Sequence, residues 1–311
     1  MEGFERRWSH VIKRKKPENL TMARTRALTP EIVDKFLDMW SKLLQEHDLE
    51  AHPQRIFNCD EAGFATSTIG TRSKLYVHTL RRDAYKKGKD CGKTMYTVLW
   101  CASASGHFIP PFTVYKAKYS RVEWEQGAIP GAKFDVSDSG WMERENFCNW
   151  MKHVFIPQTT VLDKPVILCM DGHGSHLSYK TVMLAKENGI ILVALPPNTS
   201  HALQPFDVAV FSKLKAMWRK VLVEHERETR MEGVSKNNFP VLMKRLWGRL
   251  GKSKSKGGHT TEISTDILCD QSIVAGFKEA GLLPIDRSKL DRQGYIFYMN
   301  HNLGTIWLLQ L

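Results

Sequence analysis

Three aspartates stand at positions where a carboxylate could take part in chemistry. Asp60 follows RIFNC, Asp171 directly follows the apolar run VILCM, and Asp207 begins a helical pattern after HALQPF. Each one alone is explained as readily by a turn or a helix N-cap. Together, three carboxylates from different elements can bind two Mg²⁺ or Mn²⁺ ions, which prefer oxygen ligands. Two such ions about 3.5–4 Å apart can activate a water or a 3′-hydroxyl and stabilise the leaving oxygen.

Polar side chains next to these aspartates are candidates for orienting metal ligands. The candidates are Glu61, His173, His176 and His201. Because neighbouring strand residues point to opposite faces, only one of Asp60 and Glu61 can face the site. The histidine spacing matches no zinc motif, and no HExxH pattern is present. We therefore interpret these four residues as hydrogen-bonding partners of the ligands or of the turns that carry them.

Hydrophobic periodicity predicts the elements that must position these residues. Helices are expected at Pro30–His47, capped by Thr29, and at 143–156, 178–188, from Asp207 to about Glu226, and within 271–286. Strands are expected at a short segment that ends near Asp60, and at 94–106, 107–116, 166–170 and 190–195. Strands that alternate with helices indicate an α/β fold.

Positive charge is concentrated in three stretches of a chain whose formal net charge is +12. Residues 1–28, 72–93 and 213–256 carry net charges of +5, +6 and +9. Solvated loops and helix faces would explain such runs. Alternatively, the runs form basic walls around an acidic centre, as a DNA-cutting enzyme requires. The candidate DNA contacts are Arg14, Lys15, Lys16, Arg81, Arg82, Lys86, Lys87, Lys213 and Lys215.

Several other sites are disfavoured by the composition. No two of the six cysteines have the C-x-x-C spacing of a zinc site, and we interpret them as buried, reduced thiols. No apolar run approaches the roughly 20 residues of a membrane helix, and we expect neither a membrane nor a small-molecule cofactor as a partner. Four tryptophans are interpreted as core rather than DNA-stacking residues: Trp141, Trp150, Trp218 and Trp247.

Five motifs give the chain a resemblance to a known family. In order, they are NCDEAGF, KTMYTVLWCASASGHFIPPFTVYK, VILCMDGHGSHLS, ALPPNTSHALQPFDVAVFSKLK and SIVAGFKEAGLLPID. Over roughly residues 50–290 the series resembles the DDE superfamily endonuclease domain of pogo, Tigger and Jerky elements, which are mariner-related and CENP-B-like. The resemblance implies an RNase H-like fold, with a central mixed sheet flanked by helices and short helical appendages at both ends. It also implies a site of Asp60, Asp171 and Asp207.

The resemblance further implies a reaction and a domain organisation. The reaction would be hydrolytic cutting at transposon ends, followed by attack of the 3′-hydroxyl on target DNA without a covalent protein–DNA intermediate. Residues 1–28 are expected to be a remnant of a CENP-B-type helix-turn-helix unit, and 29–250 the endonuclease domain. Residues 251–258 would be a flexible basic linker, and 259–311 a helical segment with an unassigned tail. Mariner-like enzymes suggest a homodimer, and the sequence specifies no interface for one.

Three functions remain open at this point. The first is a Mg²⁺- or Mn²⁺-dependent DNA endonuclease or transposase, which the intact aspartate trio favours. The second is a domesticated, catalytically silent nuclear protein that binds DNA or chromatin. The third is an unrelated metallohydrolase of small molecules, against which the basic stretches argue. A nuclear location is expected from the function and from the basic run at 13–16.

Overall fold

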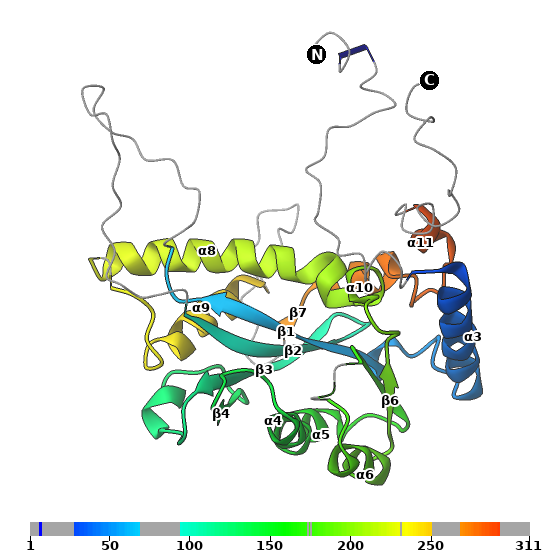
Figure 1. Ribbon diagram of the computed structural model, residues 1–311, viewed down its shortest axis with the longest axis horizontal. Helices are drawn as coiled ribbons and strands as arrows, with labels where there is room; N and C mark the ends of the chain where they lie inside the picture. The colour runs from blue at the N-terminus through cyan, green and yellow to red at the C-terminus, as the bar shows by residue number, and fades with distance from the viewer. Residues whose placement is uncertain are drawn as a thin grey trace.

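A mixed β-sheet runs through the centre of the computed structural model (Figure 1). The structure describes residues 6–7, 28–68, 94–172, 174, 176–230, 232–250 and 268–292. The strand order is β4-β3-β2-β1-β5-β6, and β7 pairs with the start of β3. The strands are β1 (Ile56–Ala65), β2 (Met95–Ser103), β3 (His107–Lys116), β4 (Lys133–Ser137), β5 (Val166–Met170), β6 (Ile190–Ala194) and β7 (Leu268–Cys269).

Strand direction brings the carboxyl ends of five strands to one edge of the sheet. Strand β1 is parallel to β5, and β5 is parallel to β6. On the other side, β2 is antiparallel to both β1 and β3, and β3 is parallel to β4. Strands β1, β3, β4, β5 and β6 therefore all point the same way. Ligands bind outside the carboxyl ends of strands in open α/β sheets, so this edge is where a site is expected.

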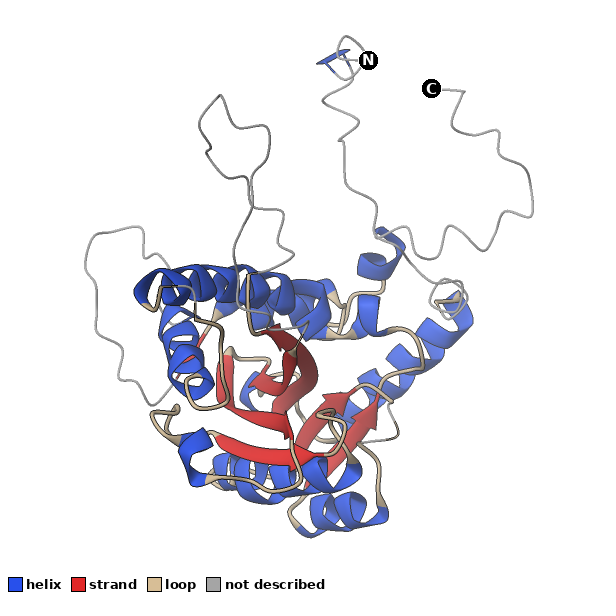
Figure 2. Ribbon diagram, turned by 60° about the vertical axis from the view of Figure 1, so that its left-hand side comes forward, coloured by secondary structure: helices blue, strands red, loops and turns tan. Residues whose placement is uncertain are grey.

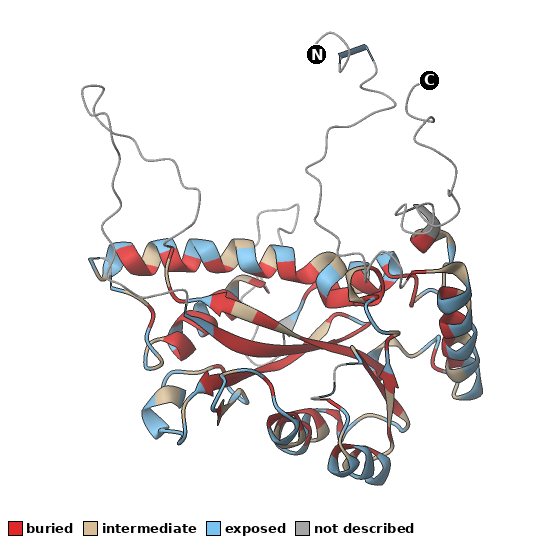
Figure 3. Cartoon of the chain, viewed as in Figure 1, coloured by how far each residue is buried: buried red, intermediate tan, exposed pale blue. Residues whose placement is uncertain are grey.

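Helices cover both faces of the sheet (Figures 1 and 2). They are α3 (Pro30–Glu46), η1 (Pro53–Arg55), η2 (Val122–Glu125), α4 (Arg144–Trp150), η3 (Met151–Phe155), α5 (Ile156–Thr159), α6 (Tyr179–Glu187), α7 (Ser200–Leu203), η4 (Phe206–Val210), α8 (Phe211–Glu228), α9 (Phe239–Leu250), α10 (Gln271–Glu279) and α11 (Ser288–Arg292). One hydrophobic core joins the sheet to α3, α8, α9 and α10, and a second joins it to α4, η3 and α6. Buried residues accordingly lie on the helix faces that point toward the sheet (Figure 3).

Strand β1 differs from its prediction. The sequence predicts a short strand that ends near Asp60, but β1 continues to Ala65. The extension pairs with β2 as far as Met95, while Ala62 and Phe64 pack into the core beneath α8. Asp60 therefore lies in the middle of a long strand, where it pairs with Trp100 of β2.

The other predicted elements are confirmed within a few residues of their ends. Thr29 caps α3 through its side-chain oxygen, and VILCM forms a β5 buried along its whole length, as expected of a parallel strand covered on both faces. The helix predicted from Asp207 begins instead with the π-helical turn η4. Strands β4 and β7 and helix α9 were not predicted.

The segments before and after the α/β region pack against the same core. The Trp40 indole of α3 donates a 2.9 Å hydrogen bond to the carbonyl of Leu282, and both side chains are buried. Residues 1–5, 8–27, 251–267 and 293–311 lie outside the described residues, so the linker at 251–258 and most of the predicted helix-turn-helix remnant fall there. Among the helices that the structure describes, none has the length and apolar character needed to cross a membrane.

The cysteine and tryptophan interpretations are only partly right. Cys59, Cys101 and Cys169 are buried free thiols, whereas Cys269 is exposed. Burial raises the pKa of the three buried thiols, and that of Cys169 reaches about 12, so they are poor nucleophiles. Three of the four tryptophans named above are core residues, but the Trp141 side chain is 62% exposed. Trp141 lies in the surface turn before α4 and not in the helix itself.

Candidate metal centre

Asp60 and Asp171 are brought together by the parallel pairing of β1 with β5. The register pairs Asn58 with Cys169, and two further residues along each strand are Asp60 and Asp171. Neighbouring strands lie about 4.8 Å apart, so this register puts the two aspartates side by side at the end of β5. The Asp60 residue is 8% exposed, and the Asp171 side chain is 34% exposed.

Asp207 reaches the same place from the other side of the fold. It lies in the π-helical turn η4, between Phe206, which is fully buried, and α8. Asp60 shares a strand face with Ala62 and Phe64, which pack into the core that also contains Phe206. Asp60 therefore faces η4, and Asp207 is exposed above it. Single π-turns within helices occur frequently at functional sites.

A buried pair of amide side chains fixes η4 on β1. Asn58 Nδ2 donates to Gln204 Oε1 at 2.8 Å and to the Cys169 carbonyl at 2.9 Å. Gln204 Nε2 donates to the Cys59 carbonyl at 3.0 Å, and the Phe206 N–H donates to Asn58 Oδ1 at 3.4 Å. Both amide side chains are fully buried. They join β1, β5 and the residues before Asp207 into one hydrogen-bonded unit.

A close backbone approach supports the same turn from behind. Gly276 of α10 lies against Pro205, and a Cβ atom at Gly276 would come within 2.5 Å of the Pro205 carbonyl oxygen. Only glycine allows α10 to approach this closely without a shift. The position of Asp207 thus depends on packing from α10 as well as on the amide pair.

The charges of the three aspartates act on one another. Burial raises the pKa of Asp60 well above its ordinary value, and the negative charges of Asp207, Glu61 and Asp171 raise it further, in that order. The hydrogen bond from the Glu61 N–H to Asp60 Oδ1, at 2.9 Å, opposes the rise. A divalent cation would relieve this repulsion, so the chemistry of the donor set fits a metal that prefers carboxylate oxygen.

The carboxylates of Asp60, Asp171 and Asp207 are not arranged around one common point in this structure. Within the part of the chain that the structure describes, no three histidine, cysteine or acidic side chains converge closely enough to hold an ion. Charge acts over a longer distance than coordination does. The charges of Asp207 and Asp171 therefore act on Asp60 although the three carboxylates do not converge on one point.

His176 connects Asp171 to Glu61 on the opposite face of β1. Its Nδ1 lies 2.8 Å from Asp171 Oδ1, and its Nε2 lies 2.8 Å from Glu61 Oε1. The ring is 1% exposed and packs on Phe147, with centroids 4.7 Å apart. Burial lowers the pKa of His176, but the hydrogen bonds and charges of Asp171 and Glu61 raise it to about 10. The two carboxylates thus favour the protonated imidazole, in which Nδ1 faces Asp171 and Nε2 faces Glu61.

The remaining predicted site residues are dispersed. His201 is half-buried in α7, and His173 lies outside the described residues. Lys213 forms a 2.5 Å ion pair with the buried carboxylate of Asp270, which ties α8 to the start of α10. Lys215 is exposed on α8, with its ammonium 5.7 Å from the Phe211 ring centroid. The other candidate DNA contacts fall outside the described residues: Arg14, Lys15, Lys16, Arg81, Arg82, Lys86 and Lys87.

Sequence reasoning missed the amide pair and the glycine that position Asp207. A signal was present for Asn58 and Gln204, because each is a polar residue in an apolar stretch close to an aspartate. Buried polar groups need partners, so two such residues could have been proposed to bond one another. The role of Gly276 depends on a contact with a distant turn and has no local signal.

Comparison with known proteins identifies similar sequences. Residues 93–247 match the family described as DDE superfamily endonuclease. The chain is 34% identical to the protein named MFS-type transporter clz9 of Cochliobolus lunatus over 246 residues, which are 76% of this chain and 24% of that protein. It is 27% identical to the Jerky protein of Mus musculus over 189 residues, 58% of this chain and 32% of that protein.

A third relative and one solved structure complete the comparison. The chain is 25% identical to Tigger transposable element-derived protein 7 of Homo sapiens over 228 residues, 66% of this chain and 40% of that protein. It thus spans about a quarter to two fifths of the length of these curated relatives. The Mos1 strand transfer complex is similar in structure, with a TM-score of 0.50 and 11% identity over 97% of this chain and 71% of that chain. This similarity confirms the RNase H-like fold.

Proposed function

Because the chain belongs to the DDE superfamily of endonucleases, we propose that it is the core of a transposase-derived, metal-dependent DNA endonuclease and strand transferase. The observation that carries the proposal is the geometry: the register of β1 with β5 sets Asp60 beside Asp171, and the buried amide pair fixes the turn before Asp207 on the same strand. The three carboxylates come from a strand, a strand end and a helix start that only the fold brings together. A two-metal site for phosphodiester chemistry needs such a cluster.

Asp60, Asp171 and Asp207 would hold Mg²⁺ or Mn²⁺. The ions, when bound, would activate the attacking water or 3′-hydroxyl and stabilise the leaving oxygen. The protein's own part is to fix the ligands. Asn58 and Gln204 hold the turn before Asp207 on β1, and His176 orients the Asp171 carboxylate through its 2.8 Å contact.

Basic residues of α8 supply a surface for the DNA backbone. Lys215, Arg219 and Lys220 are exposed on this helix. Some other cations of the same basic stretch have carboxylate partners. Arg245, for example, pairs with Glu228 at 2.6 Å. We expect phosphate contacts from the first group, which would make affinity for DNA fall steeply with salt.

The proposal is tested by nicking of supercoiled plasmid in Mg²⁺ or Mn²⁺. Wild-type protein should nick, and Asp60→Asn, Asp171→Asn and Asp207→Asn should each lose at least about a hundredfold in rate, as the loss of a group that acts in the transition state does. Asp163→Asn is the matched control, because Asp163 is an exposed aspartate just before β5. A folded wild type that binds DNA without nicking it would favour the catalytically silent alternative.

A homodimer and a nuclear location remain further proposals. Light scattering of the purified protein would show a mass of about twice 35.7 kDa for a dimer. Nuclear accumulation of a fluorescent fusion should be lost when the basic run at 13–16 is replaced by alanines.

A further inference from the structure

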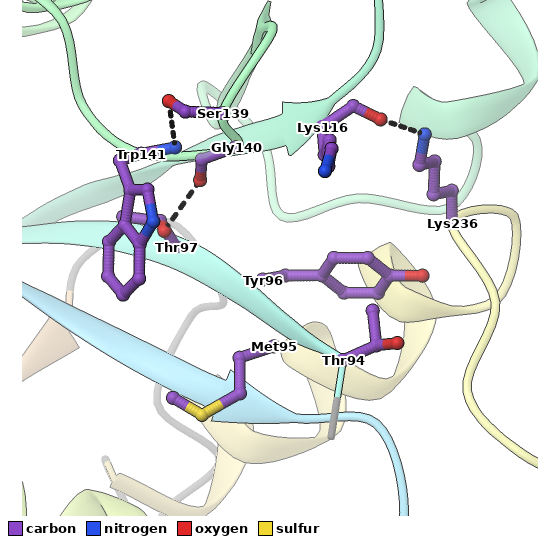
Figure 4. Close-up of a pocket in the computed structure, with 9 residues that line it drawn as sticks. All are labelled: Thr94, Met95, Tyr96, Thr97, Lys116, Ser139, Gly140, Trp141 and Lys236. Atoms are coloured by element: carbon purple, nitrogen blue, oxygen red, sulfur yellow. Dashed lines mark hydrogen bonds between the residues drawn. The ribbon is translucent and has the colours of Figure 1, made fainter. Parts of the chain in front are cut away.

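A surface hollow lies where strand β2 begins and strand β3 ends. It encloses about 480 Å³ and is bounded by Trp141, Met95, Lys116 and Lys236 (Figure 4). The Trp141 side chain is 62% exposed and that of Met95 is 50% exposed. An aromatic ring held open to solvent beside two lysines is suited to an anionic ligand that has a flat apolar part.

Hydrogen bonds hold the backbone of the turn before α4, which carries Trp141. The Trp141 N–H donates to Ser139 Oγ at 3.1 Å, and its carbonyl accepts from Ser137 Oγ at 2.8 Å. The Gly140 carbonyl accepts from the Thr97 hydroxyl at 2.8 Å (Figure 4). Gly140 has a φ of +78°, which favours glycine. The ring is therefore displayed on a hydrogen-bonded turn rather than on a free loop.

The two lysines differ in how they are held. Lys116 is the exposed last residue of β3. The Lys236 ammonium donates to the Lys116 carbonyl at 2.7 Å and lies 4.2 Å from the Trp124 ring centroid. Lys236 is thus held in place by these two contacts, whereas Lys116 is exposed. Both attract phosphate, although acids are also nearby: Ser139 Oγ donates to Glu143 at 3.2 Å, and the charge of Glu125 acts on Tyr115, the ring beside Lys236.

One side-chain contact links the segment that carries Trp141 to the turn after Asp171. Three residues after Trp141, the exposed Arg144 donates from Nε to the Gly174 carbonyl at 3.0 Å, in the turn that follows Asp171. Three residues span at most about 10 Å. A DNA strand that extends from Asp171 across Arg144 would therefore run toward Trp141.

We propose that this hollow binds an unpaired nucleobase of a DNA strand held at the aspartate site, with the base stacked on Trp141 and its phosphate at Lys116. The inference rests on the proposed function, because it takes the strand to be DNA positioned for cleavage. Stacking on an aromatic ring tolerates any base, so the hollow would hold a nucleotide without reading its identity.

The test uses a fluorescein-labelled 12-nucleotide single strand, titrated with metal-free protein and followed by anisotropy. Trp141→Ala should weaken binding by roughly 5- to 150-fold, the range found for loss of one base-stacking contact. Trp141→Phe should recover most of the affinity. Tyr119→Ala is the matched control, because Tyr119 is an aromatic residue with 81% exposure that does not line the hollow, and its affinity should equal that of the wild type.

An abasic scan of the same strand separates stacking from a general loss of charge or fold. One abasic position should weaken binding to wild type and leave binding to Trp141→Ala unchanged. Equal affinities for Trp141→Ala and Tyr119→Ala, or abasic penalties that are the same in both proteins, would overturn the inference. If the wild type nicks plasmid with the expected aspartate dependence but binds no single strand, the inference fails and the proposed function stands. A wild type that neither nicks nor binds overturns both.

Discussion

Replacing Gln204 with methionine tests how the fold positions Asp207. Methionine matches the length of glutamine but neither donates nor accepts as the amide does. The change removes the 2.8 Å bond from Asn58 Nδ2 and the 3.0 Å bond to the Cys59 carbonyl. Both groups are fully buried, so water cannot readily replace the lost partners.

The expected loss of stability follows from these two groups. Each buried polar group that loses its partner costs roughly 1–3 kcal/mol, so Gln204→Met should lower the free energy of unfolding by about 2–6 kcal/mol. The total for a domain is only about 5–15 kcal/mol. Urea titration in EDTA would measure the change, and EDTA prevents bound metal from adding its own stabilisation. Gln126→Met, at an exposed glutamine after η2, should change stability by less than about 0.5 kcal/mol.

A double-mutant cycle with Asn58→Leu tests whether the amide pair itself is responsible. In the double variant neither amide is left facing an apolar partner. Its free energy of unfolding should therefore fall by about 1–3 kcal/mol less than the sum of the falls in the two single variants. Additive losses, or a Gln204→Met variant as stable as the Gln126→Met control, would refute the reasoning.

Three further changes test other contacts of the site. Gly276→Ala should cost about 1–3 kcal/mol by thermal or urea unfolding, because the new Cβ would press on the Pro205 carbonyl; an unchanged stability would show that the turn can yield. Although burial alone raises the pKa of Asp270, hydrogen bonding to Lys213 and to its own helix cap lowers it below 3.8, so its stabilisation is present above about pH 4 and lost as pH falls through the lowered pKa. Asp270→Asn should thus be less stable than wild type at pH 7 by about 1–3 kcal/mol, with the difference shrinking in acid; a constant difference would contradict this. Asp60→Asn should raise the melting temperature of metal-free protein by a few degrees at pH 7, because a carboxyl whose pKa is raised destabilises the fold once it ionises; a lowered melting temperature would contradict it.

Most of the elements that carry the site could be predicted from local patterns. The buried strand VILCM and the helices with an apolar face follow from the burial that each pattern requires. The length of β1 could not be predicted, because residues after Asp60 are held by pairing with β2, some thirty residues away. The exposure of Trp141 also escaped prediction, since composition favours a buried tryptophan and only the turn at Gly140 directs it outward.

At the candidate site, too, local sequence patterns predict some features, while contacts between residues far apart in the sequence determine others. Each aspartate follows a patterned stretch of sequence, so the trio could be proposed from the sequence, although Asp60 lies within β1 and not at its end. The position of Asp207 depends on the hydrogen bond between Asn58 and Gln204, which are 146 positions apart. No local pattern encodes such a pairing, and the ion pair of Lys213 with Asp270, 57 positions apart, was missed for the same reason.

The central claim is that Asp60, Asp171 and Asp207 form one metal site. Calorimetric titration of Mn²⁺ into metal-free wild type and into each of the three aspartate-to-asparagine variants tests it most directly, with Asp163→Asn as the control. The account predicts saturable binding to wild type and to the control, and at least a tenfold loss of affinity in each of the three variants, about 1.4 kcal/mol or more. Equal affinity in wild type and Asp60→Asn would contradict it, because the buried aspartate at the centre of the cluster would then hold no metal.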